Sequence, residues 1–374
     1  MRRLLPLLLL VLVPAPATAL ADGCPPSTCG TTGSAVPGSR TLFIRPFGQQ
    51  GPLQAFDLVT GARRYSLPSG YLSADGTTFA SSARPKTRRT TVVRYDARTG
   101  RLRGGRSLRG RWEVAGISVD GGRVALIRSR GRATVIKVGA SRNALRGLFE
   151  VEALSPDGRR VFLVHWRDNG YDLQQLDLNS RALSPTRLDD PDEKMSGTAI
   201  TSVATRDGNW LLTLYAKDDT HSFVHALDLR SGLAHCVDLP LTGGLFALGS
   251  TALMLSPDEK SLYLASPYLG RLATVDLQKL ELARVVRFRG LSENLVNMSI
   301  GPSAAVTPNG RMLAFSGSGS LWLYDTAYGV VRRALRSGPA IKGLGFRPDG
   351  RSLLAIRAPT TAIAFDAATG RRIG

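Results

Sequence analysis

The amino-acid sequence predicts an all-β protein that folds as a single β-propeller, and three observations support this. A turn signal of the form Ser/Thr-Pro-Asp-Gly recurs about eight times along the 374 residues. Short apolar runs rich in Val, Leu, Phe and Tyr follow it, as in Val161–Trp166 and Ser261–Ala265. No stretch holds a helical period. Each repeat of roughly 40 to 50 residues is therefore interpreted as four short antiparallel strands, the unit of a propeller blade.

The first turn signal marks each repeat. Its copies are Ser73–Gly76, Ser118–Gly121, Ser155–Gly158, Thr205–Gly208, Ser256–Glu259, Thr307–Gly310 and Arg347–Gly350, preceded by a degenerate copy at Val36–Arg40. In such a turn Pro presets the first backbone angle, Asp or Asn holds the local backbone, and Gly takes the positive φ that other residues resist. We therefore expect each copy to join the first and second strands of a blade.

A second turn signal lies about 20 residues after the first. Its clear copies are Asp57–Gly61, Asp96–Gly100, Asp228–Gly232 and Asp366–Gly370, and weaker copies begin at Asp177, Asp276 and Asp325. We expect it to join the third and fourth strands, which puts both signals on one face of the ring. The connections between strands two and three, and between blades, then lie on the opposite face, which we call the loop face.

The number of turn markers favours eight blades, with seven as the alternative. The first copy has no good innermost strand before Val36, and the last copy ends at Gly374 with little chain left for an outermost strand. These complementary gaps suggest that the two terminal segments complete each other and close the ring. A closed ring buries both faces of every blade and leaves only short, protected strand edges.

Two stretches also resemble a known propeller repeat. Leu154–Phe162 and Val306–Phe315 look like the repeat of TolB-like proteins, and the whole set is similar to bacterial YVTN-type and WD-type propellers. The Trp-Asp and Gly-His signatures of eukaryotic-type WD repeats are absent from the blade ends. The resemblance implies an architecture, and the TolB-like part suggests a structural module of an envelope assembly. It transfers no catalytic residue, because propellers host binding proteins, scaffolds and unrelated enzymes.

The N-terminal residues have the pattern of an export signal. Arg2 and Arg3 precede an apolar run from Leu4 to Val13, and small residues follow. This predicts a signal peptide over residues 1–21 and an exported protein that is extracellular, cell-wall associated or periplasmic. The run is too short to span a bilayer, and no later segment has the roughly 20 apolar residues that a span needs.

Residues 22–33 are predicted to form a flexible leader before a propeller over residues 34–374. Outside the cytoplasm Cys24 and Cys29 can close a small disulfide, and two free thiols are the alternative. Cys24 also admits a lipoprotein interpretation, in which a lipid at this residue would tether the protein to a membrane, although Ala21 and Asp22 fit a lipobox poorly. Cys236 lies on an apolar strand pattern and is interpreted as a buried small hydrophobe.

Positive charge is concentrated in one part of the chain. There are 49 Lys and Arg residues against 29 Asp and Glu, an excess of +20 that is carried mostly by 42 arginines. Residues 84–146 hold eighteen of these cations and only three acids. Loops of the second, third and fourth repeats gather eight cations on one side of the loop face: Arg84, Lys86, Arg88, Arg89, Arg128, Arg130, Arg132 and Arg167.

This group predicts a polyanion site, because the planar guanidinium fork holds phosphates and carboxylates in pairs of hydrogen bonds. The alternative is that the arginine content reflects codon usage and that the charged loops are simply solvated. Acidic loops are expected across the ring, which would make the loop face electrically asymmetric. They contain Asp189, Asp190, Asp192 and Glu193, and Asp218 and Asp219.

Signals for metal binding and catalysis are weak. His221 and His225 lie on one side of a strand and, with Asp218 and Asp219, could seed a metal site. The loop Asp189–Glu193 could hold calcium through its oxygens. No dedicated motif surrounds either group, so an ordinary strand and a solvated turn are the simpler interpretations. We therefore predict no metal and no cofactor.

A catalytic propeller would need polar or acidic side chains on its innermost strands. Those strands look apolar, in Gly116–Val119, Ala153–Leu154, Leu253–Leu255 and Leu344–Phe346. The four tryptophans, Trp112, Trp166, Trp210 and Trp322, are expected to pack between blades.

The sequence predicts an exported, non-catalytic binding or scaffolding module. Its predicted partner is an anionic envelope polymer or a protein on the loop face. We expect a monomer that does not bind genomic DNA and that meets a membrane only if it is lipidated at Cys24. A propeller enzyme of the lactonase or hydrolase type is the alternative function.

Overall fold

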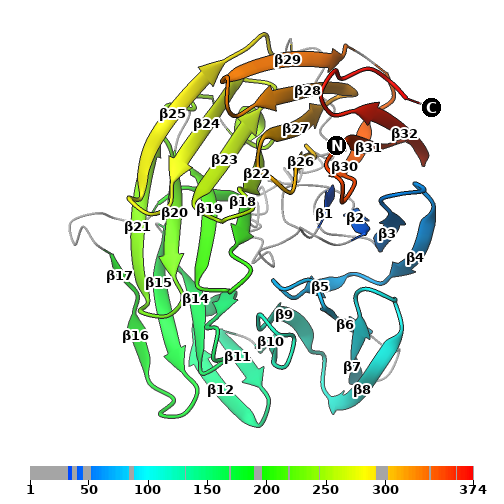
Figure 1. Cartoon of the computed structure of the whole chain (residues 1–374). Coiled ribbons are helices and arrows are strands. Elements are labelled where there is room, and N and C mark those ends of the chain that lie inside the picture. Colours follow the sequence, from blue (N-terminus) through cyan, green and yellow to red (C-terminus); the bar gives the residue numbers. More distant parts are fainter. Residues whose placement is uncertain are drawn as a thin grey trace, which may run out of the picture.

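The computed structural model describes residues 33–35, 40–44, 52–83, 88–130, 132–167, 170–188, 196–217, 220–243, 245–291, 302–336, 338–358 and 360–373. These residues form eight sheets arranged around a centre, so the protein is an eight-bladed β-propeller (Figure 1). The predicted fold class and the number of blades are confirmed. The predicted signal peptide, Cys24 and Cys29 lie outside the described residues.

Six blades contain four antiparallel strands in chain order. Blade 1 consists of β1 (Gly33–Ala35), β2 (Thr41–Ile44), β3 (Leu53–Asp57) and β4 (Arg63–Leu67), and blade 2 of β5 (Gly70–Leu72), β6 (Thr78–Ala83), β7 (Arg89–Asp96) and β8 (Leu102–Arg109). Blade 3 consists of β9 (Glu113–Ile117), β10 (Val124–Arg130), β11 (Ala133–Val138) and β12 (Ser141–Arg146), and blade 4 of β13 (Leu148–Leu154), β14 (Arg160–Arg167), β15 (Gly170–Asp177) and β16 (Leu183–Pro185). Blade 6 consists of β22 (Ala252–Leu255), β23 (Ser261–Ser266), β24 (Arg271–Asp276) and β25 (Glu281–Arg287), and blade 7 of β26 (Ala304–Val306), β27 (Met312–Gly317), β28 (Ser320–Asp325) and β29 (Val330–Leu335).

Blades 5 and 8 depart from this pattern. Blade 5 consists of β18 (Thr198–Ala204), β19 (Trp210–Ala216), β20 (Ser222–Asp228) and β21 (Leu233–Leu239), with β17 (Arg187–Leu188) added parallel to β21. Blade 8 has only β30 (Ile341–Phe346), β31 (Ser352–Arg357) and β32 (Thr361–Asp366). The short helix α1 (Leu245–Leu248) connects blades 5 and 6. Within the described part of the chain no helix is long and apolar enough to cross a membrane.

The two predicted turn signals form the connections assigned to them. In the turn Ser155–Gly158 the Ser155 hydroxyl donates to Asp157 Oδ1 at 2.5 Å, and the Arg160 amide donates to Ser155 Oγ at 2.9 Å. Gly158 has a φ of +64°, which only glycine adopts without strain. In the second signal, the Asp57 carboxylate accepts the amides of Val59 and Thr60.

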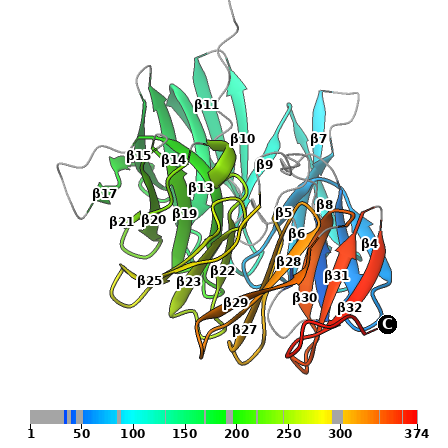
Figure 2. The same ribbon diagram turned by 90° about the horizontal axis from the view of Figure 1, so that it is seen from above.

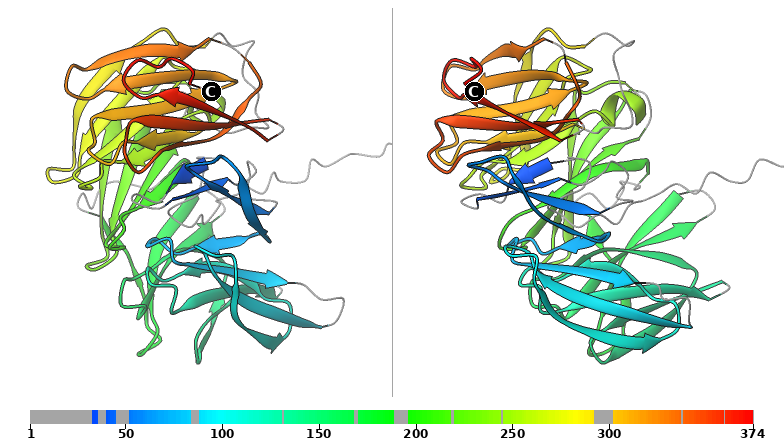
Figure 3. Two further views of the ribbon diagram at one scale, coloured as in Figure 1. Left: turned by 45° about the vertical axis from the view of Figure 1, so that its right-hand side comes forward. Right: turned by 90° about the vertical axis from the view of Figure 1, so that its right-hand side faces the viewer.

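The ring closes by packing of blade 1 against blade 8. Leu42 and Ile44 of β2 form one apolar cluster with Leu354 and Ile356 of β31, and the two blades lie side by side in Figure 3. The predicted completion of one blade by the two terminal segments is wrong. Blade 1 has its own innermost strand β1, which the sequence did not reveal because Gly-Ser-Ala has no apolar pattern. Blade 8 instead ends in a single bridge between Phe365 and Arg372.

The hydrophobic core lies between neighbouring blades, and the tryptophans belong to it as predicted. Trp112 is 3% exposed and packs where blades 2 and 3 meet, and Trp322 is 1% exposed and packs where blades 6 and 7 meet. Trp166 and Trp210 are half-buried against the clusters at blades 4 and 5 and at blades 5 and 6. Each blade therefore uses large side chains to fill the wedge beside it.

Candidate anion-binding face

The order of strands gives the ring two unlike faces. The turns between strands one and two and between strands three and four form one face, which we call the turn face. The remaining connections form the loop face, and the edge-on view of Figure 2 separates the two. Both faces are built from the same repeat. A difference in charge between them therefore depends on which residues the repeat places in the turns of one face and in the loops of the other.

The repeat fixes its aspartates on the turn face. There each carboxylate accepts a backbone amide within its own turn, and the set is Asp57, Asp75, Asp96, Asp120, Asp157, Asp177, Asp207, Asp228, Asp258, Asp276, Asp325, Asp349 and Asp366. The Ser118 hydroxyl and the Gly122 amide, which bond to Asp120, hold the pKa of this carboxyl below its usual value. The aspartates of the repeat therefore lie away from the cations of the loop face.

The predicted site residues that the structure describes lie on the loop face. Arg89 begins β7, the third strand of blade 2, and Arg88 precedes it. Arg128 is near the end of β10, and Arg132 lies between β10 and β11. Arg167 ends β14. Arg84, Lys86 and the side chain of Arg130 lie outside the described residues.

Backbone contacts bring the loops of blades 2 and 3 together. The Gly110 amide donates to the Arg88 carbonyl at 2.7 Å. The Arg128 guanidinium stacks on Trp112 at 4.5 Å from the ring centre, and a Cβ at Gly110 would lie 2.6 Å from its Nη1. Arg88 and Arg128, forty residues apart, therefore lie on either side of Gly110.

A similar backbone hydrogen bond occurs where blade 3 connects to blade 4. The Gly147 amide donates to the Arg132 carbonyl at 2.9 Å, and a Cβ at Gly147 would lie 2.5 Å from Nε2 of His165. His165 is two residues before Arg167 on β14. Arg167 differs from the other predicted cations, because its Nε forms an ion pair with Asp172 at 2.7 Å, so its charge is already compensated.

The structure adds cations to this face that sequence reasoning did not single out. Arg109 lies directly opposite Arg89 in the β7–β8 pair, and like charges in that position destabilise a sheet. Arg111 and Arg146 are exposed beside them. The exposed Glu113, which begins β9, is the acid of this region. The turn Asp96–Gly100 alone does not give this pair, because the register of β7 and β8 shifts by one residue between Arg94 and Tyr95.

Cations also occur on the loop face beyond blade 4. Arg271 lies opposite Arg287 in blade 6, and Arg333 is close enough to Arg336 and Arg289 for them to lower its pKa, after burial as the main cause. The predicted acidic loops that would balance this face, Asp189–Glu193 and Asp218–Asp219, lie outside the described residues. The asymmetry of charge across the ring therefore stays a prediction.

The predicted histidine pair does not share one environment. His225 is fully buried on β20, edge-on to Tyr215 and with its Nδ1 4.0 Å from Cys236 Sγ, whereas His221 is exposed and bonded to Thr220. Cys236 lies on a strand, β21, as predicted, but it is half-buried and not fully buried as expected. Within the part of the chain that is described, no three His, Cys, Asp or Glu side chains group closely enough to hold a metal.

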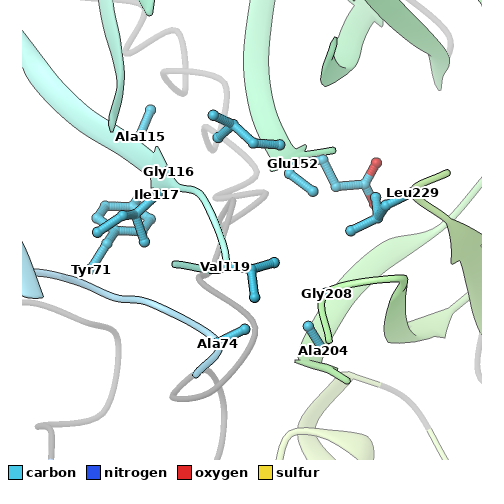
Figure 4. A pocket seen from close by; sticks show the side chains of 12 residues that line it. Tyr71, Ala74, Ala115, Gly116, Ile117, Val119, Glu152, Ala204, Gly208 and Leu229 are labelled. Carbon is cyan, nitrogen blue, oxygen red and sulfur yellow. The ribbon is translucent and has the colours of Figure 1, made fainter. Parts of the chain in front are cut away.

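A small hollow near the centre of the ring contains a carboxyl group that the sequence reasoning overlooked. Residues of blades 2 to 5 line it, and Glu152 is the charged residue among them (Figure 4). Its volume is about 20 Å³, enough for roughly one water molecule. The innermost strands are therefore less uniformly apolar than their sequences predict.

Comparison with known proteins supports the fold and does not identify a function. No family model matches the chain, and no curated protein sequence matches it either. The dihydro-heme d1 dehydrogenase NirN, solved in complex with DHE, is similar with a TM-score of 0.54 and 16% identity, over 91% of this chain and 73% of that one.

Two further propellers are similar over nearly their whole length. The Dos1 propeller gives a TM-score of 0.53 at 12% identity, over 94% of this chain and 96% of that one. The C-terminal WD40 domain of Sif2 gives 0.52 at 12% identity, over 91% and 97%. At such identities the likeness shows the β-propeller architecture, which commonly serves as a binding scaffold.

Proposed function

We propose that the protein is an exported binding module whose loop face, at blades 2 and 3, holds an anionic polymer of the cell envelope. The observation that carries the proposal is the grouping of Arg88, Arg89, Arg109 and Arg128 around the junction of these blades. Two of them, Arg89 and Arg109, face each other across a strand pair, an arrangement that costs stability in the absence of an anion.

The chemistry of arginine suits such a ligand. Each guanidinium offers a planar fork of donors that matches phosphate, sulfate and carboxylate groups, and it stays charged at any physiological pH. Several arginines spaced along a surface bind a chain of anions better than a single small ion, because every contact releases counterions from the polymer. Export is supported by the N-terminal pattern of the sequence, which also gives the polymer its place outside the cytoplasm.

The test is binding of heparin, used as a soluble sulfated polymer, by the mature protein and by an Arg89→Glu/Arg109→Glu variant. At about 1 kcal/mol for each cation lost at an anionic surface, and with a new acid in each place, the variant is expected to bind roughly 30-fold more weakly at low salt. The fall in affinity with rising salt should also be shallower for the variant, because fewer counterions are released.

The matched control is Arg98→Glu/Arg101→Glu, which makes the same change of charge in the same blade but on the turn face. Both arginines are exposed at the turn between β7 and β8. This control should retain most of the native affinity. Equal losses in the two variants would show that only net charge matters, and a native protein that does not bind heparin at low salt would rule out the proposal.

A further inference from the structure

A second basic feature lies between blades 2 and 3, on the side of the turn face and the outer rim. It is a slot of about 370 Å³. Its cationic lining residues are Arg94 and Arg106 of blade 2 and Arg123 and Lys137 of blade 3. Glycines lie at its edge, and the space beside Gly139 is open, because a Cβ there would meet no atom within 4 Å.

The register of the strands explains why these cations face one another. Arg106 lies opposite Val92, and Val92 packs with Leu126 in the apolar cluster shared by the two blades. Lys137 lies opposite Leu126 on the facing blade. Closer to the loop face the two blades thus meet through apolar side chains, and toward the turn face the same two surfaces present cations.

The equivalent interface between blades 5 and 6 has apolar residues at the positions that these cations occupy. By strand register, Ala226 and Val237 of blade 5 stand where Arg94 and Arg106 stand in blade 2. Likewise, Ala273 of blade 6 stands where Lys137 stands in blade 3. Those residues are 0%, 5% and 0% exposed and form one continuous core cluster. The slot therefore replaces a packed apolar contact with a hollow and three positive charges.

Nothing acidic balances these charges within the described lining. Two carboxylates of the same blades make other contacts: Asp96 forms an ion pair with Arg103 at 2.6 Å, and Asp120 accepts the Ser118 hydroxyl at 2.6 Å. Burial, followed by repulsion from Arg106 and Arg142, lowers the pKa of Lys137. Lys137 donates to the Gly139 carbonyl at 2.6 Å, and Arg94 donates to the Gly122 carbonyl at 3.3 Å, both at the edge of the slot.

We infer that this slot binds a tetrahedral oxyanion, the phosphate or sulfate group of a small ligand or of a polymer. Three guanidinium groups and one ammonium line a hollow large enough for such a group with its attached atoms, and charge-assisted bonds to the anion would offset their mutual repulsion. The slot opens on the side opposite the loop face, so this site is separate from the one proposed above.

Isothermal titration calorimetry of the whole mature protein with sodium phosphate at low ionic strength tests the inference. The native protein should bind at one saturable site, sulfate should compete, and acetate should not. Arg106→Gln/Lys137→Gln should weaken binding at least tenfold. Arg106→Val/Lys137→Ala removes the charges and copies the apolar residues of the blade 5–6 interface. Circular dichroism and thermal unfolding of both variants show whether they fold, so a loss of binding in a folded variant is assigned to the lost charges.

Further arms separate the alternatives. Arg98→Gln/Arg101→Gln, in the same blade but outside the slot, should bind phosphate as the native protein does. Arg89→Glu/Arg109→Glu should also bind it normally, which distinguishes the slot from the loop face. Tighter binding of a short polyphosphate than of orthophosphate would identify a polymer as the ligand, and equal affinity would identify a free anion. Absence of saturable phosphate and sulfate binding, or native affinity in both slot variants, would overturn the inference.

Discussion

Glu152 is expected to cost the native protein about 3 kcal/mol of folding stability as the pH rises from about 4.5 to about 7, and Glu152→Gln is expected to abolish this pH dependence. Glu152 lies on the innermost strand of blade 4, at a bulge where the pairing of β13 with β14 shifts between Val151 and Ala153. Neither of its carboxylate oxygens has a hydrogen-bond partner among the described residues, and both are shielded from solvent although the residue as a whole is partly exposed. Its surroundings in the central hollow are apolar residues such as Leu154 and Leu229.

The direction of the effect follows from the pKa of this group. Burial raises the pKa of Glu152 from 4.5 to about 7. Below pH 4.5 the carboxyl is protonated in both the folded and the unfolded chain and contributes nothing. Between the two values only the unfolded chain releases its proton, so stability falls by about 1.4 kcal/mol for each pH unit. Above pH 7 the folded protein ionises too, and the loss is complete.

Urea unfolding of the native protein and of Glu152→Gln at pH 4.5, 5.5 and 8 measures this difference. The buried amide of the variant costs a constant amount at every pH, so the quantity to compare is the change with pH and not the absolute stability. Glu281→Gln is the control, because it makes the same substitution at an exposed residue of β25 whose ion pair with Lys279 is exposed as well. Its effect on stability should be far smaller than that of Glu152→Gln. Parallel profiles for the native protein and Glu152→Gln would contradict the prediction.

The aspartates of the turns produce the opposite slope at lower pH and do not obscure the result. The side-chain hydrogen bond from Arg103 lowers the pKa of Asp96 to about 2. Stability from such a group is fully present above the unfolded value of 3.8 and is lost as the pH falls toward 2. That window lies below the range in which Glu152 acts.

Local signals made the fold predictable. A turn such as Ser155–Gly158 is specified by a few adjacent residues, and the alternation of turn and loop connections then decides which face a hairpin residue occupies. The positions of Arg88, Arg128 and Arg132 on the loop face follow from that connectivity alone. Assigning these loop arginines to one face therefore requires no knowledge of the contacts between blades.

Features that depend on irregular pairing or on two blades at once were not predictable. The β-bulge at Glu152 interrupts the alternation of side chains between the two faces of the strand. A carboxylate therefore lies in the central hollow, on an innermost strand that the sequence pattern indicated to be apolar. Arg106 and Lys137 each look like ordinary strand cations, and only the packing of blade 2 on blade 3 brings them into one slot. The sequence of one repeat alone does not show which side chain of the next blade will lie beside it.

Replacing Trp112 by Ala is expected to cost about 3 to 5 kcal/mol of stability and to weaken both anion sites. Trp112 is 3% exposed, its indole donates to the Arg109 carbonyl at 3.1 Å, and its ring supports the Arg128 guanidinium. Removing the ring leaves a cavity at the junction and removes the stacking of the Arg128 guanidinium on the indole. Because Leu108 packs in the same cluster and lines the slot, the slot loses support as well.

Phe162→Ala is the control that separates a general loss of stability from a specific loss of anion binding. Phe162 is fully buried at the interface of blades 4 and 5, and the guanidinium of Arg160, on the turn-face side, lies 5.8 Å from its ring centre. Its truncation should cost a similar 3 to 5 kcal/mol. Measured well below the unfolding midpoint, Phe162→Ala should bind heparin and phosphate as the native protein does, whereas Trp112→Ala should bind both at least tenfold more weakly. If the two variants are equally destabilised and both keep native affinities, the junction of blades 2 and 3 is not where anions bind.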